Sequence, residues 1–123
     1  GGTLAGLVDG LAQTGKHDTS QLLGIAVLKG QEYLEQLVEN LLTDRHHKSE
    51  WSISHDYHFG GYAKSNNELN QFCAAFEKQT QIALEPVYSG KLFYALYQLT
   101  INGYFPAGSR VLAIHTGGLQ GAR

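Results

Sequence analysis

The sequence contains no methionine, one cysteine and two prolines in 123 residues. Because translation starts at methionine, we expect a chain that is processed or that is a piece of a longer polypeptide. Cys73 cannot form an internal disulfide, which favours a reducing compartment such as the cytoplasm. The net charge is −2 and basic residues do not cluster, which argues against nucleic acid as a partner. No apolar run has the length of a membrane span and no signal peptide is visible, so we expect no membrane partner.

The residues that are present indicate one small globular domain with a real core. Hydrophobic residues make up 42% of the chain and charged residues 16%, which is typical of folded rather than disordered proteins. Apolar residues recur at helical spacing in several segments, and short apolar runs between them are typical of buried parallel strands. The predicted elements are a helix that starts at Leu4, with Thr3 as a possible N-cap, and stops at Gly15, a strand over 22–28, a helix over about 31–46, a strand near 51–54, a helix opened by a capping box at 65–68, a helix over 89–101 and a strand over 110–114.

This alternation predicts an α/β fold. The helix over 89–101 is apolar nearly all round, so we expect it to be buried on several sides or to lie against a partner. Polar, glycine-rich clusters stand at element ends, where α/β folds bind ligands. One is Glu85–Lys91, before that helix, and the other is His115–Gly121, after the last predicted strand.

Tyr88 and Thr116 are the first candidates for chemistry in these clusters. Tyr88 can present a ring face and a phenol to a cavity, where it would stack on a cofactor or act as an acid or base. Thr116 can bind a ligand's ring nitrogen, with the next two glycines leaving room for close approach. The spacing alone favours the ordinary alternatives, a core tyrosine and a turn residue.

Two further groups of residues are candidates for ligand binding. Gly1, Gly2 and Thr3 precede a helix and can form the end of a phosphate cradle, the alternative being a vector remnant. His55 and His58 flank Asp56 and suggest a metal site, but no fourth ligand has convincing spacing. We therefore expect surface or loop histidines and no metal.

Four blocks taken together resemble one enzyme family. Residues 1–7 are similar to the G-T-x-A-G-[LM] loop and helix that hold the pyridoxal phosphate group in D-cysteine desulfhydrases and 1-aminocyclopropane-1-carboxylate deaminases. Residues 85–91 are similar to the family's D-P-V-Y-[TE]-G-K block, and 111–118 to its strand and H-[TL]-G-G terminus. Gly61 and Tyr62 resemble its second active-site tyrosine segment.

The resemblance implies a fold and a place within it. The family has the tryptophan synthase β-like, fold-type II architecture. Residues 1–123 would be the C-terminal part of the large pyridoxal-phosphate-binding domain, with a three-layer, partial doubly wound, mainly parallel sheet. The upstream half, with the lysine that carries pyridoxal and the nucleophilic serine, would be absent, so the chain alone is expected to be inactive. Lys91 does not match that lysine.

The resemblance also implies residue roles. Gly1, Gly2 and Thr3 would bind the phosphate of pyridoxal 5'-phosphate in the full-length parent. Thr116 would meet the pyridine nitrogen, where a hydroxyl gives a weaker electron sink than a carboxylate. Tyr88 would lie by the cofactor ring and the substrate, and Tyr62 would bind or deprotonate the substrate.

The implied activity is a lyase or deaminase that releases ammonia and a 2-oxo acid from a small amino acid. Ser89 stands where the deaminase branch has glutamate, and Thr116 where it usually has leucine, which leans towards the desulfhydrase branch. Leu4 and Glu85 replace a common histidine and the usual aspartate, so the substrate stays open.

Two other hypotheses remain. The chain can be a complete, non-catalytic α/β binding or interaction module, with its apolar helix at a dimer interface; a reading frame that starts just before Gly1 would favour this. It can also come from another fold-type II enzyme such as a dehydratase, against which the tyrosine block argues. If the partner half is missing, exposed apolar helices predict self-association or a homodimer.

Overall fold

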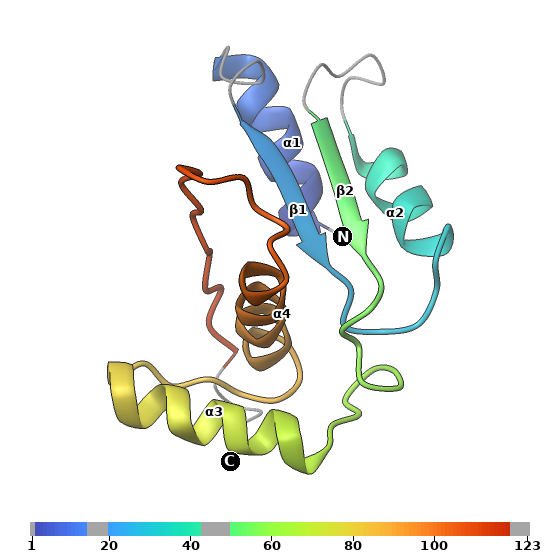
Figure 1. Cartoon of the computed structure of the whole chain (residues 1–123). Helices are drawn as coiled ribbons and strands as arrows, with labels where there is room; N and C mark the ends of the chain where they lie inside the picture. Colours follow the sequence, from blue (N-terminus) through green and yellow to red (C-terminus); the bar gives the residue numbers. More distant parts are fainter. Residues whose placement is uncertain (1, 15–19, 43–49, 119–123) are drawn as a thin grey trace. The chain divides into compact units, whose positions relative to one another are not determined.

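The computed structural model describes residues 2–14, 20–42 and 50–118, and these fall into two compact units (Figure 1). The described residues of 2–26 and 30–55 form the first unit, and those of 27–29 and 56–118 form the second. Gly1 and the part of the predicted helix beyond Leu42, with His46, lie outside the described residues.

A parallel pair of strands forms the centre of the first unit. Strand β1 (Gln21–Ile25) and strand β2 (Glu50–Ser54) pair in the register Gln21↔Glu50 to Ile25↔Ser54. Helix α2 (Tyr33–Leu41) lies between them in the sequence, as a crossover between parallel strands requires. The α/β class and the parallel sheet are thereby confirmed, with a sheet of two strands in the described chain.

Helices α1 (Gly2–Thr14) and α2 pack on the same face of this sheet. Ala5 and Val8 of α1 form one buried cluster with Val38 of α2, and Leu22, Trp51 and Ile53 of the strands pack against it. Gly24 belongs to this face too, since a Cβ built there would lie 2.9 Å from Leu4 Cδ2. A side chain at Gly24 would therefore displace the end of the Leu4 side chain.

Aromatic rings build the core of the second unit, between helix α3 (Asn67–Thr80) and helix α4 (Ser89–Ile101). Leu69, Cys73 and Leu84 are buried there. Phe72 meets Tyr94 edge-on, with 5.5 Å between ring centroids, and Phe76 lies 5.1 Å from Phe93. These contacts hold α4 against α3 and leave the first turn of α4 at the centre of the unit.

The strand predicted over 110–114 is wrong, because these residues form no strand in the structure. A strand needs a neighbour to complete its hydrogen bonds, and within the described chain the only strands pair with each other. Its apolar side chains are exposed instead, Leu112 to 86%.

Three other local predictions change with the structure. Helix α1 begins at Gly2, so Thr3 lies in its first turn and is not the N-cap. The cap of α3 is Asn66, one residue later than a box at Ser65 implies, and its side chain accepts from Leu69 N at 2.8 Å.

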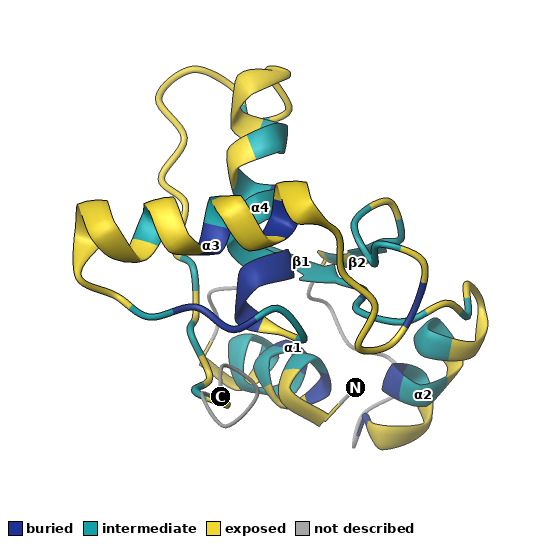
Figure 2. Ribbon diagram, turned by 90° about the horizontal axis from the view of Figure 1, so that it is seen from below, coloured by how far each residue is buried: buried dark blue, intermediate teal, exposed yellow. Residues whose placement is uncertain are grey.

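The bounds of α4 are confirmed at Ser89–Ile101, and the predicted burial on several sides is found over part of the helix only. Figure 2 shows that α4 is buried at its start and exposed towards its end. Tyr97 and Ile101 are exposed to 54% and 60%. Self-association through such apolar surface stays a prediction.

No helix among the described residues has both the length and the apolar character of a membrane span.

Candidate functional site

The carboxylate of Glu85 is fully buried and closes the start of α4. Its Oε2 accepts from Val87 N at 2.6 Å, and its Oε1 accepts from Tyr88 N at 2.7 Å and Ser89 N at 2.6 Å. The Ser89 hydroxyl completes the cap, donating to Oε1 at 3.3 Å and accepting from Glu85 N at 3.0 Å. The first amides of a helix lack intrahelical partners and attract negative charge. This cap therefore fixes the backbone at Tyr88.

Tyr88 and Tyr62 come together as a pair of phenols. Their hydroxyl oxygens lie 3.0 Å apart, and their rings meet edge-on with centroids 6.0 Å apart. Both side chains are exposed, to 45% and 55%. The hydrogen bond with Tyr62 is the main cause that raises the pKa of Tyr88, followed by burial. The Tyr88 phenol therefore keeps its proton at neutral pH and can donate it to a bound molecule.

The loop that carries Tyr62 is held from α4 by Lys91. The Lys91 side chain is fully buried, and its Nζ donates to three backbone carbonyls: His58 O at 2.7 Å, Gly61 O at 3.0 Å and Val27 O at 3.1 Å. Burial lowers the pKa of Lys91, and the charge of Glu85 opposes this effect. Glu85 and Lys91 thus fix the two segments that bring the phenols together.

The segment 115–118 lies beside Tyr88. A Cβ built at Gly118 would be 4.0 Å from Tyr88 Cδ2. His115 anchors the segment, because its Nε2 bonds Ala83 O and its Nδ1 accepts from Gly117 N, both at 3.0 Å. These partners require the neutral ring with its proton on Nε2. Thr116, between the anchored residues, is exposed, and its hydroxyl bonds no residue that the structure describes.

The predicted phosphate cradle is only partly described. Gly1 lies outside the described residues, while Gly2 and Thr3 form the exposed first turn of α1. That turn carries no acidic side chain, and no atom lies within 4 Å of a Cβ built at Gly2. Free amides at such a helix start can hold an anion. Gly2 and Thr3 belong to the first unit, and both tyrosines and Thr116 to the second.

The histidines have local partners. His55 Nε2 lies 2.5 Å from Glu35 Oε1 of α2, and His58 Nδ1 accepts from Gly60 N at 3.0 Å. Over 2–14, 20–42 and 50–118, no three His, Cys, Asp or Glu side chains gather as metal ligands would.

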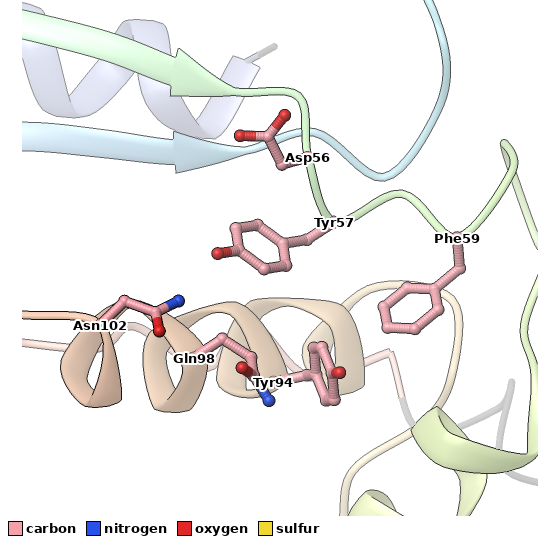
Figure 3. Close-up of a pocket in the computed structure, with 6 residues that line it drawn as sticks. All are labelled: Asp56, Tyr57, Phe59, Tyr94, Gln98 and Asn102. Atoms are coloured by element: carbon pink, nitrogen blue, oxygen red, sulfur yellow. The ribbon is translucent and has the colours of Figure 1, made fainter. Parts of the chain in front are cut away.

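An open hollow of about 350 Å³ runs beside α4. Figure 3 shows its lining: Asp56, Tyr57 and Phe59 come from the loop after β2, Tyr94 and Gln98 come from α4, and Asn102 is the residue that follows α4. The Tyr94 hydroxyl is already bonded to Glu68 at 2.8 Å. The hollow contains neither phenol of the tyrosine pair, so it is a separate feature of this unit.

The sequence analysis identified Tyr88 and Tyr62 as candidates, but it did not predict that Glu85 caps α4 and that Lys91 holds the loop before Tyr62. A signal for both was available. Lys91 is a charge in the first turn of an otherwise apolar helix, and Glu85 stands a short distance before the same helix start. A charge at a predicted buried position indicates a set of hydrogen-bond partners, because it would not be buried without them.

No family model matches the chain. A Pyrococcus horikoshii protein provisionally named 1-aminocyclopropane-1-carboxylate deaminase is 35% identical over 98% of this chain and 38% of its own length. The 1-aminocyclopropane-1-carboxylate deaminase of Rhizobium radiobacter is 31% identical over 96% of this chain and 37% of its own.

A solved structure gives the same result in three dimensions. The crystal structure of an ACC deaminase homologue matches 98% of this chain with a TM-score of 0.80 and 33% identity, and the match covers 37% of that protein. The chain therefore spans a little over a third of the length of these relatives. Over that part of the fold, the chain is a homologue of 1-aminocyclopropane-1-carboxylate deaminases.

Proposed function

We propose that this chain forms the C-terminal part of the cofactor domain of a pyridoxal-phosphate-dependent enzyme that acts on a small amino acid and releases ammonia and a 2-oxo acid. The observation that carries the proposal is the pair of exposed phenols, 3.0 Å apart, beside the segment with the unpartnered Thr116 hydroxyl. The homology to 1-aminocyclopropane-1-carboxylate deaminases over this part of the fold supports it. The lysine that carries the cofactor would lie upstream, so the 123 residues alone would be inactive.

Each named residue has a role that its surroundings support. Pyridoxal phosphate, when bound, supplies the electron sink of the reaction. Gly2 and Thr3, together with Gly1, would bind its phosphate with the free amides of the α1 start. The Thr116 hydroxyl has free hydrogen-bonding capacity and would meet the pyridine nitrogen.

The phenols of Tyr88 and Tyr62 would act in proton transfer. A phenol carries its proton at neutral pH, and the bond with Tyr62, which raises the pKa of Tyr88, keeps it protonated there. We assign it the proton that a leaving group such as sulfide takes up as it departs. Tyr62 would bind the substrate and exchange a proton with Tyr88 across their hydrogen bond.

The substrate branch is proposed from Ser89. Ser89 is only 4% exposed, and its hydroxyl makes two hydrogen bonds to Glu85. This hydroxyl is therefore unavailable to a substrate. A reaction that needs a second acid or base next to Tyr88 would not find it there. We therefore favour β-elimination from an amino acid such as D-cysteine over opening of a cyclopropane ring.

The experiment uses the full-length polypeptide that contains this chain. We expect bound cofactor by visible absorbance, and release of ammonia and pyruvate from D-cysteine faster than of 2-oxobutyrate from the cyclopropane amino acid. Tyr88→Phe should lower kcat by about 10²- to 10⁴-fold with the cofactor absorbance retained, as loss of a general acid does. Tyr104→Phe is the matched control, since Tyr104 is exposed and packs its ring on Phe105. Absence of bound cofactor and of any 2-oxo acid would refute the proposal.

A further inference from the structure

The three carbonyls around Lys91 Nζ define the state of its side chain. An ammonium has three N–H donors, and the acceptors His58 O, Gly61 O and Val27 O use all of them. A neutral amine would offer two donors and turn its lone pair towards the third carbonyl. The charge is therefore part of the arrangement, although the side chain is fully buried.

The segment 58–63, which this ammonium holds, has a strained backbone conformation. Phe59 and Ala63 have φ angles of 58° and 57°, in the left-handed region that residues with a Cβ adopt only at a cost. Gly60 and Gly61 between them also have positive φ. A run of such conformations needs support from outside the run, and Lys91 bonds to its carbonyls at both His58 and Gly61. Gly61 is the residue immediately before Tyr62.

The other phenol is fixed by the same turn of α4. Lys91 lies three residues after Tyr88, whose amide is bonded to Glu85. One helix start thus carries Tyr88 directly and grips the segment that carries Tyr62. We propose that Lys91 is a positioning residue, whose ammonium holds the Tyr62 phenol within hydrogen-bonding distance of Tyr88. Its effect on turnover rests on the proposed function, whereas its effect on the tyrosine pair does not.

A purely structural role for Lys91 makes a different prediction. If the side chain only supports the core, its loss would lower stability and leave the phenol pair as it is in the folded molecules. If it positions the pair, its loss would separate the hydroxyls and remove the main cause of the raised pKa of Tyr88. The pKa of one phenol therefore distinguishes the two roles.

The test compares Lys91→Met with Lys78→Met in the full-length polypeptide. Both remove an ammonium, but Lys78 is exposed near the end of α3. Tyrosines labelled with ¹³C at Cζ are titrated by NMR, with Tyr62→Phe and Tyr88→Phe as assignments. We expect Lys91→Met to lower the pKa of Tyr88 to its value in Tyr62→Phe, and Lys78→Met to leave it unchanged. With cofactor bound, kcat should fall about 10²-fold, the effect of a misplacement near 1 Å. An unchanged Tyr88 pKa in folded Lys91→Met would overturn the proposal.

A second measurement decides the matter if Lys91→Met does not fold. In the unsubstituted protein, the amides of Gly61 and Lys64 are bonded to His58 O and Gly61 O inside the segment. If the ammonium fixes the segment, these amides exchange with solvent only through global unfolding. Their free energy of opening, measured by hydrogen exchange, then equals that of the amide of Ala95, a buried residue of α4. Exchange through a local opening would overturn the proposal. Neither NMR result depends on cofactor or activity, so a failure of the proposed function would be seen separately, as absence of cofactor absorbance and product.

Discussion

Replacing Gly90 by alanine should destabilise the second unit because α4 starts in close contact with its neighbours. A Cβ built at Gly90 lies 2.6 Å from Cys73 Sγ and 2.7 Å from Glu85 O. The sulfur sits on a side chain and can rotate away. The carbonyl cannot, since it belongs to the backbone of a fully buried residue and accepts from Gly90 N at 2.7 Å.

The expected size follows from two opposing effects. Forcing a methyl into a packed core costs about 1–3 kcal/mol or more, and here one of the two clashes is with backbone. Alanine in place of glycine favours a helix by about 0.5–1 kcal/mol. The clash is the larger effect, so we expect Gly90→Ala to lower the free energy of unfolding by about 2 kcal/mol. Cys73→Ala should recover only part of this loss, because the contact with Glu85 O remains.

Urea unfolding followed by circular dichroism measures the loss, and Trp51 fluorescence reports on the first unit separately. Gly10→Ala is the matched control with the opposite sign. Gly10 lies inside α1, and no described neighbour lies within 4 Å of a Cβ built there. Gly10→Ala should therefore raise the free energy of unfolding by about 0.5–1 kcal/mol. A Gly90→Ala variant as stable as the parent, or a loss fully rescued by Cys73→Ala, would refute the reasoning.

Three further predictions concern charges and hydrogen bonds. Glu85→Gln places an amide donor where Oε2 accepts from Val87 N, and should cost about 2–3 kcal/mol in urea unfolding; a loss below about 0.5 kcal/mol would contradict the cap. Burial, with the hydrogen bond to Glu68, raises the pKa of Tyr94 to about 12. Its contribution to stability should be complete below pH 10 and disappear as the pH rises through 12, and Glu68→Gln should lower that pKa in an NMR titration. Burial raises the pKa of Glu35, but the hydrogen bonds from His55 and the backbone outweigh it and the net pKa is lowered. The stability that ionised Glu35 contributes is present above the ordinary carboxyl pKa and is lost as the pH falls through the lowered pKa of Glu35. His55→Ala should raise the pKa of Glu35, and an unchanged pKa would count against the hydrogen bond.

Local patterns in the sequence predicted the elements whose causes are local. The apolar run over 22–28 predicted β1, although the strand ends at Ile25. The amphipathic stripe of α2 and the bounds of α4 could also be predicted from spacing. The strand over 110–114 could not, because a strand depends on a neighbour that its own sequence does not specify. The cap of α3 was placed one residue early because Ser65 and Asn66 are both good capping residues, and only the bond to Leu69 N distinguishes them.

The tyrosine pair could be named from the resemblance, but its support could not. Lys91 bonds to His58 and Val27, which are 33 and 64 residues away in the sequence. No local spacing encodes such contacts. They exist because the folded chain brings three carbonyls to one ammonium.

Hydrogen-bonding capacity separates the residues that build this site from those that are free to act. The Glu85 carboxylate accepts from three amides and a hydroxyl, and the Lys91 ammonium donates to three carbonyls, so neither has a group left for a substrate. Tyr62, Tyr88 and Thr116 are exposed, and among the residues that the structure describes the two phenols hydrogen-bond only to each other. In the sequence, Glu85, Tyr88 and Lys91 lie within seven positions and all are candidates for acid–base chemistry. The strongest charges in that block are structural because they are saturated, and the neutral phenol between them is the group that chemistry can use.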